Sequence, residues 1–119
     1  KETLLKESDI VTLHIALNAE TRDFIAEKDL ALMKPSAILV NTARGPVVNE
    51  QALAKALKDG TIAGAATDVY GTEPPLKQDN PLFDAPNLLM LPHIGFATEE
   101  AFVLRLGIVV DNVEKWLAQ

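Results

Sequence analysis

Four polar side chains follow short apolar runs in the sequence, and their types suit proton transfer on a small anion: Arg44, Asp68, Glu73 and His93. An imidazole gains and loses a proton near neutral pH, so it can act as a general acid or a general base. A carboxylate can orient such an imidazole, and a guanidinium can hold a substrate carboxylate through two parallel hydrogen bonds. The four residues therefore form a candidate catalytic set if the fold brings them together.

Each of the four residues also has an ordinary structural explanation. Arg44 could form a surface ion pair, and Asp68 could cap a turn. Glu73 could simply be solvated, and His93, which precedes Ile94-Gly95, could hydrogen-bond within its own loop. For each residue alone, the structural explanation competes with a catalytic role. Only a shared location of all four residues would favour the catalytic role.

The apolar runs that precede these residues have the length and β-branched content of buried strands: residues 10–15, 37–40, 62–69 and 88–91. Helical segments separate at least the first three runs, an alternation that is typical of a parallel sheet with right-handed crossovers. The predicted fold class is α/β, a partial doubly wound, Rossmann-like parallel sheet with flanking helices and a long C-terminal helix. In such sheets ligands bind at the carboxyl ends of the strands, where the four polar residues lie.

Two helices are predicted between the strands. The first covers residues 26–33 and ends before Pro35, since proline disfavours helix in the residue that precedes it. The second begins after Asn49, whose side chain can cap it, and ends at Gly60, which can adopt the left-handed turn.

The last third of the chain predicts a loop and then a long helix. Residues 71–87 hold four of the seven prolines, so we expect an ordered loop there. Thr98 is the expected cap of the long helix, and Glu99 and Glu100 favour its positive N-terminal end. We expect the apolar stripe of this helix to cover the sheet or a neighbouring domain: Phe102, Leu106, Val109, Val110, Val113, Trp116 and Leu117.

Length and composition limit the class of protein. The 119 residues, 48% of them hydrophobic, suffice for one folded unit. A formal net charge of −6 with scattered basic residues argues against a nucleic-acid partner. Cysteine is absent, the apolar runs are too short to span a membrane, and the first residues are too polar for a signal peptide. We therefore expect a cytoplasmic protein with neither a nucleic-acid nor a membrane partner.

Other catalytic and metal chemistries lack the residues that they need. The serines are Ser8 and Ser36, neither in a GxSxG turn, and without cysteine a nucleophilic hydrolase has little to use. No phosphate-binding Walker loop is present. His14 and His93 lie far apart and show no HExxH spacing, so no metal site is predicted and His14 is expected to be a packed or wall residue.

The chain resembles the D-isomer-specific 2-hydroxyacid dehydrogenases in three segments, LMKPSAILVNTARGPVVNEQALAKAL, GAATDVYGTEPP and NLLMLPHIGFATEEA. The resemblance runs from about Ser8 to the C-terminus. It implies an NAD-dependent oxidoreductase, with NADP not excluded, that interconverts a small D-2-hydroxy acid and its 2-oxo acid. It also implies that Arg44 orients the substrate, that His93 is the general acid and base, and that Glu73 pairs with His93.

The resemblance further implies a set of cofactor contacts: Ile15, Thr42, Ala43, Arg44, Asp68, His93 and Gly95. Two positions depart from the family pattern, Ala16 where many relatives carry proline and Thr67 where they commonly carry leucine, but neither departure removes a functional group. Glu73 argues against the related formate dehydrogenases, whose pattern implies glutamine there.

The resemblance also leads us to expect that residues 1–119 are the C-terminal portion of a dinucleotide-binding domain. The GxGxxG loop and the acidic residue that follows it in the family are absent from this sequence. The last helix would then contact an absent substrate domain. The strand at 10–15 would have a free edge, which predicts a homodimer or pairing with a missing N-terminal half of the same protein. Alone, such a fragment is predicted to bind NAD weakly and to be inactive.

Two other functions remain open at this point. One is a non-catalytic, dinucleotide-sensing scaffold related to the C-terminal-binding-protein corepressors, which retain the same three polar residues. The other is an inert, truncated remnant that merely folds. The sequence does not identify the 2-oxo acid.

Overall fold

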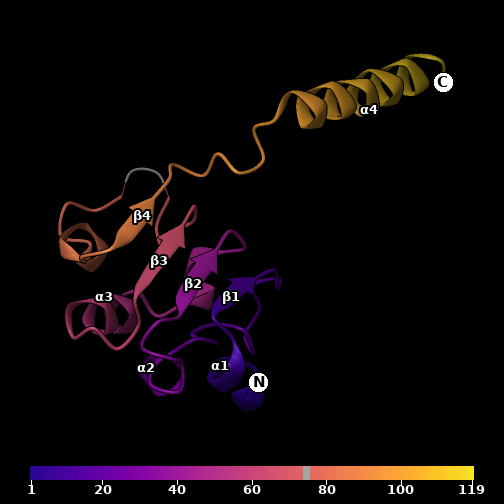
Figure 1. Ribbon diagram of the computed structural model, residues 1–119. Coiled ribbons are helices and arrows are strands. Elements are labelled where there is room, and N and C mark those ends of the chain that lie inside the picture. The colour runs from indigo at the N-terminus through magenta and orange to yellow at the C-terminus, as the bar shows by residue number, and fades with distance from the viewer. Residues whose placement is uncertain (74–75) are drawn as a thin grey trace.

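The computed structural model describes residues 1–73 and 76–119, and its centre is a four-stranded parallel sheet in the order β1-β2-β3-β4 (Figure 1). The strands are β1 Ile10–Leu13, β2 Ile38–Asn41, β3 Gly64–Thr67 and β4 Leu88–Met90. All three pairings are parallel. The predicted α/β class is therefore confirmed, although three of the strands are shorter than predicted and β2 begins and ends one residue later.

Short helices connect the strands, and two of the connections contain 3₁₀ turns. The elements are α1 Glu2–Glu7, α2 Glu27–Leu30, η1 Gly45–Val47, α3 Glu50–Lys58, η2 Pro81–Asp84 and α4 Glu99–Leu117. The turn η2 lies in the segment predicted as an ordered loop, of which Pro74 and Pro75 fall outside the described residues.

The predicted helix at 26–33 is too long, because α2 ends at Leu30. Beyond that point the backbone continues in tighter turns, in which the amides of Leu32 and Met33 donate to the carbonyls of Asp29 and Leu30, both at 3.1 Å. Such three-residue spacing is common where an α-helix ends. Pro35 explains why no further α-helical turn forms, since it disfavours helix in the residue before it.

The predicted ends of α3 are confirmed. The side-chain oxygen of Asn49 accepts a hydrogen bond of 2.9 Å from the amide of Ala52, which satisfies one of the free donors at the helix start. Gly60 has a φ of 67°, the left-handed conformation that follows many helices and that glycine adopts without strain.

The core lies on one face of the sheet. Val11, Leu39 and Ala65 are neighbours across β1, β2 and β3, and all three are buried. Alternate residues point to the opposite face because side chains alternate along a strand, and there Ile10 and Ile38 are 63% and 40% exposed. The helices α1 to α3 therefore cover one side of the sheet, and the other side is open.

Helix α4 extends away from the sheet (Figure 1). Thr98 caps it as predicted, accepting from the amide of Ala101 at 3.2 Å, but no residue of this helix is buried. The expectation that its apolar stripe covers the sheet is therefore wrong: residues 91–98 carry the helix outward. That it covers a neighbouring domain stays a prediction. Within the described residues no helix, α4 included, has both the length and the apolar character that crossing a bilayer requires.

Candidate active site

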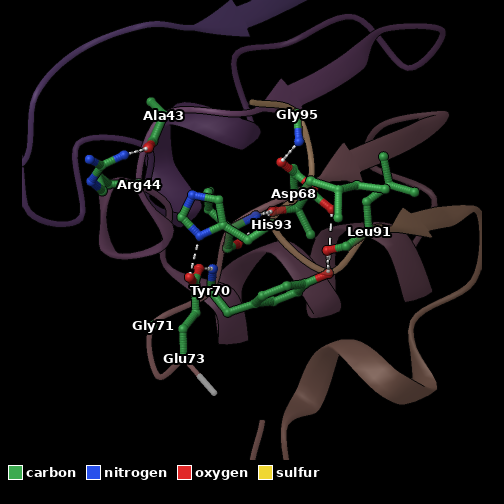
Figure 2. Close-up of polar contacts among 12 residues, drawn as sticks. Ala43, Arg44, Asp68, Tyr70, Gly71, Glu73, Leu91, His93 and Gly95 are labelled. Atoms are coloured by element: carbon green, nitrogen blue, oxygen red, sulfur yellow. Dashed lines mark hydrogen bonds and ion pairs between the residues drawn. The ribbon is translucent and has the colours of Figure 1, made fainter. Parts of the chain in front are cut away.

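The candidate residues gather at the carboxyl ends of the parallel strands. Arg44 lies three residues beyond β2 and directly precedes η1, Asp68 directly follows β3, and His93 lies three residues beyond β4. Because the strands are parallel, these ends meet at one edge of the sheet. Figure 2 shows the polar contacts that connect the segments after β3 and β4 with Glu73, and the contact of Arg44 with the neighbouring Ala43.

His93 and Glu73 form a direct pair. The imidazole Nδ1 lies 2.5 Å from Oε2 of Glu73, and Oε1 of the same carboxylate accepts a hydrogen bond of 2.5 Å from the amide of Tyr70 (Figure 2). An ionised carboxylate can only accept, so Nδ1 carries the proton in this pair. The side chains of His93 and Glu73 are 42% and 25% exposed. The other ring nitrogen, Nε2, is thus the one that can exchange a proton with a bound molecule.

Asp68 fastens the turn that carries His93. Its two carboxylate oxygens accept hydrogen bonds from the amides of Ile94 at 2.8 Å and Gly95 at 2.7 Å, and the residue is only 3% exposed. His93 has a φ of 57°, a left-handed conformation that is uncommon for a residue with a side chain. The hydrogen bonds to Asp68 stabilise this strained turn, so the capping explanation of Asp68 holds, and its predicted cofactor contact stays a prediction.

Tyr70 joins the segments after β3 and β4, and the sequence did not indicate it. Its hydroxyl donates to the carbonyl of Leu91 at 2.7 Å, two residues before His93. Burial raises the pKa of this phenol, and the charges of Asp68 and Glu73 raise the pKa further. The hydroxyl therefore remains protonated as a donor. A tyrosine that ends an apolar run is expected to be a core residue, so nothing in the local pattern indicates this link.

Glu50 holds the loop that carries Glu73. Its Oε1 accepts from the amide of Gly71 at 2.6 Å, and its Oε2 accepts from Nδ2 of Asn80 at 3.0 Å. The two donors flank the segment in which Glu73 lies. Its place in the sequence indicates only an acidic residue in the first turn of a helix, because its partners lie 21 and 30 residues away.

Replacing Glu50 with alanine is expected to lower the free energy of unfolding by about 2 kcal/mol, because two hydrogen bonds to a partly buried charged group are lost. Glu50→Gln should lose about half as much, since its amide keeps one oxygen acceptor. Urea denaturation measures both, with Gln51→Ala, an exposed neighbour on α3, as the control. A Glu50→Ala protein as stable as the unchanged one would contradict this role.

Two adjoining cavities lie along this edge of the sheet. The first, of about 520 Å³, is lined by Thr42, Arg44, Asp68, His93, Gly95, Phe96 and Arg105. The second, of about 680 Å³, is lined by His14, Ile15, Ala16, Leu17, Thr42, Ala43 and Arg44. They share Thr42 and Arg44, and between them they include every residue that the sequence predicts as a cofactor contact. Glu73 lies instead in a third cavity, of about 470 Å³, which shares His93 and Phe96 with the first.

The side chain of Arg44 is held by the backbone of the preceding residue. Its Nη1 donates to the carbonyl of Ala43 at 2.7 Å (Figure 2). Within residues 1–73 and 76–119 no carboxylate lies within 4 Å of this guanidinium, so the surface ion pair considered from the sequence is not observed. Its remaining donors are available to a bound anion.

Residues 1–95 match the family described as D-isomer specific 2-hydroxyacid dehydrogenase, NAD binding domain. The chain is 56% identical over 112 residues to a glyoxylate reductase of Thermococcus litoralis, covering 94% of this chain and 33% of that protein. It is 50% identical over 119 residues to a glycerate dehydrogenase of Methylorubrum extorquens, covering 98% and 38%. A solved D-lactate dehydrogenase of Aquifex aeolicus, complexed with NAD and lactic acid, superposes with a TM-score of 0.85 at 30% identity, covering 98% of this chain and 39% of that one. The chain thus spans about a third of the length of the relatives that it matches.

Proposed function

The chain belongs to the D-isomer specific 2-hydroxyacid dehydrogenase family, matching its NAD-binding domain, and from this we propose that it carries the catalytic residues of an oxidoreductase. The proposed reaction interconverts a small D-2-hydroxy acid and its 2-oxo acid, with NAD as the hydride carrier and NADP not excluded. The observation that carries the proposal is the His93–Glu73 pair beside a cavity that Arg44 also lines.

His93 serves as the proton donor and acceptor. In the direction of reduction, Nε2 gives its proton to the carbonyl oxygen of the 2-oxo acid, and in the direction of oxidation it takes the proton from the hydroxyl group. Glu73 accepts the hydrogen bond of Nδ1, so it orients the ring and leaves Nε2 for the substrate. Arg44 binds the substrate carboxylate in a planar, two-point contact and thereby places the C2 oxygen toward His93.

The residues of this edge fit a nicotinamide cofactor. The two adjoining cavities form a hollow at the carboxyl ends of the strands, with small side chains such as Ala16, Ala43 and Gly95 in the walls. When bound, the nicotinamide supplies or accepts the hydride at C2 of the substrate. Thr42 and Arg44 line both cavities, which supports the proposal that they contact the cofactor and the substrate together.

Assembly and location belong to the same proposal. Residues 1–119 would form the C-terminal portion of the dinucleotide-binding domain, in a cytoplasmic protein. Strand β1 pairs only with β2 within the described residues, so its other backbone edge is available. A homodimer, or pairing with another part of the same protein, would satisfy that edge.

The proposal predicts that the intact natural protein reduces at least one of glyoxylate, hydroxypyruvate and pyruvate with NADH, at a turnover on the order of 1–10³ s⁻¹. Loss of NADH absorbance measures the rate, and NADPH is tested in parallel. A protein that gives no rate above that of cofactor and acid alone would contradict the proposal and favour the scaffold or remnant function.

A further inference from the structure

A second guanidinium faces the cavity that holds the catalytic candidates. Arg105, in the second turn of α4, lines the first cavity together with Arg44 and His93. Its guanidinium carbon lies 5.1 Å from the centre of the Phe96 ring, a cation–π distance, and that ring meets the His93 ring edge to face at 6.1 Å. Phe96 therefore connects Arg105 to the imidazole.

The two guanidiniums of this cavity have no carboxylate partner among the described residues. Among the described residues that line this cavity, Asp68 alone has a carboxylate, and both of its oxygens accept backbone hydrogen bonds. Glu73, outside this lining, is paired with His93. Within the part of the chain that the structure describes, no carboxylate lies within 4 Å of Arg44 or Arg105. Both guanidiniums therefore keep free donors at the cavity, whereas the nearby carboxylates of Asp68 and Glu73 are already engaged, in a chain whose formal net charge is −6. A site of this kind attracts anions.

One guanidinium suffices for a simple 2-hydroxy acid, and that role is assigned above to Arg44. We propose that Arg105 is a specificity-determining residue, and that the site prefers 2-hydroxy and 2-oxo acids that carry a second anionic group, a carboxylate or a phosphate, on the carbon next to C2. The inference rests on the proposed function and names the substrate class of the same site. The stacking on Phe96 limits the directions that the guanidinium can take, so that less freedom is lost when the second anion binds.

The preference is tested by binding, with matched pairs of acids that differ in the second anion. D-malate is compared with D-lactate for a carboxylate, and 3-phospho-D-glycerate with D-glycerate for a phosphate. Titrations are followed through the arginine side-chain Nε–Hε resonances by NMR, with and without NADH, with which hydroxy acids do not react. We expect at least one acid with a second anionic group to bind about tenfold more tightly than the matched acid that lacks this group, and the two pairs show which anion is preferred.

Arg105→Met, which keeps an unbranched stem and removes the guanidinium and its charge, is expected to reduce this preference to less than about twofold, while D-lactate binds as before. Arg105→Lys should retain part of the preference, because the ammonium keeps the positive charge but lacks the planar donors of the guanidinium. Lys115→Met is the matched control, since it removes one positive charge from the far end of α4 and should leave the preference unchanged. A preference absent from the unchanged protein, or fully kept in Arg105→Met, would overturn the inference.

The outcomes separate this inference from the proposed function. If Arg105 makes the protein bind the acids with a second anionic group more tightly, but the protein reduces no 2-oxo acid, the inference is supported and the catalytic proposal is refuted. A protein that reduces glyoxylate and shows no effect of Arg105→Met on the ratio of affinities would keep the catalytic proposal and refute the inference.

Discussion

Replacing His93 with asparagine is expected to lower kcat for 2-oxo acid reduction by about 10²–10⁴-fold, the usual loss when a positioned general acid is removed. The amide nitrogen of asparagine can still donate a hydrogen bond to Glu73. It can therefore replace the 2.5 Å contact between His93 Nδ1 and Glu73 without carrying a charge. What disappears is Nε2, the ring nitrogen that is not bound to Glu73 and that the proposed reaction uses for proton transfer. KM should change less than kcat, because Arg44 still binds the carboxylate.

Steady-state kinetics on the intact natural protein measure this effect, with circular dichroism and the unfolding midpoint as tests that the variant is folded. The left-handed backbone at His93 suits asparagine, which tolerates this conformation better than most residues. A folded His93→Asn protein with less than a tenfold loss of kcat would show that another group supplies the proton.

Replacing Gly45 with alanine is expected to lower the free energy of unfolding by about 3 kcal/mol, at the upper end of what overpacking a core usually costs. A methyl group at this position would overlap the backbone carbonyl of Tyr70 and crowd the amide of Gly71. These backbone atoms cannot easily move away, because the amide of Tyr70 is hydrogen-bonded to Glu73 and the hydroxyl of Tyr70 is hydrogen-bonded to the carbonyl of Leu91. The substitution should therefore displace the segment that positions Glu73 and also reduce activity.

Urea denaturation measures the change, and the chain offers a matched control. Gly107 lies inside α4, where an added methyl group would meet nothing within 4 Å. Gly107→Ala is expected to raise stability by up to about 1 kcal/mol, because alanine is the better helix former. If Gly45→Ala unfolds at the same urea concentration as the unchanged protein, the close approach of η1 to Tyr70 is not required for stability.

The local features of the fold could be predicted, because each depends on residues a few positions apart. The alternation of apolar runs with helices, the caps at Asn49 and Thr98 and the left-handed Gly60 all follow from such short-range patterns. Residue types also indicated Arg44 and His93 as chemical candidates, and the structure brings both to one cavity. Their roles in catalysis stay predictions until the kinetics are measured.

Contacts between residues far apart in the chain could not be predicted, and only the tertiary structure decided them. Glu50 reaches Gly71 and Asn80, and Tyr70 reaches Leu91, but each of these residues also has a sufficient local explanation, as a helix start or a core side chain. The apolar stripe of α4 predicted a covered surface without identifying the cover, and here the sheet is not that cover. Periodicity records which side of an element is apolar. It contains no information about which distant side chains lie opposite, because that depends on how the parallel strands place their connecting loops at one edge of the sheet.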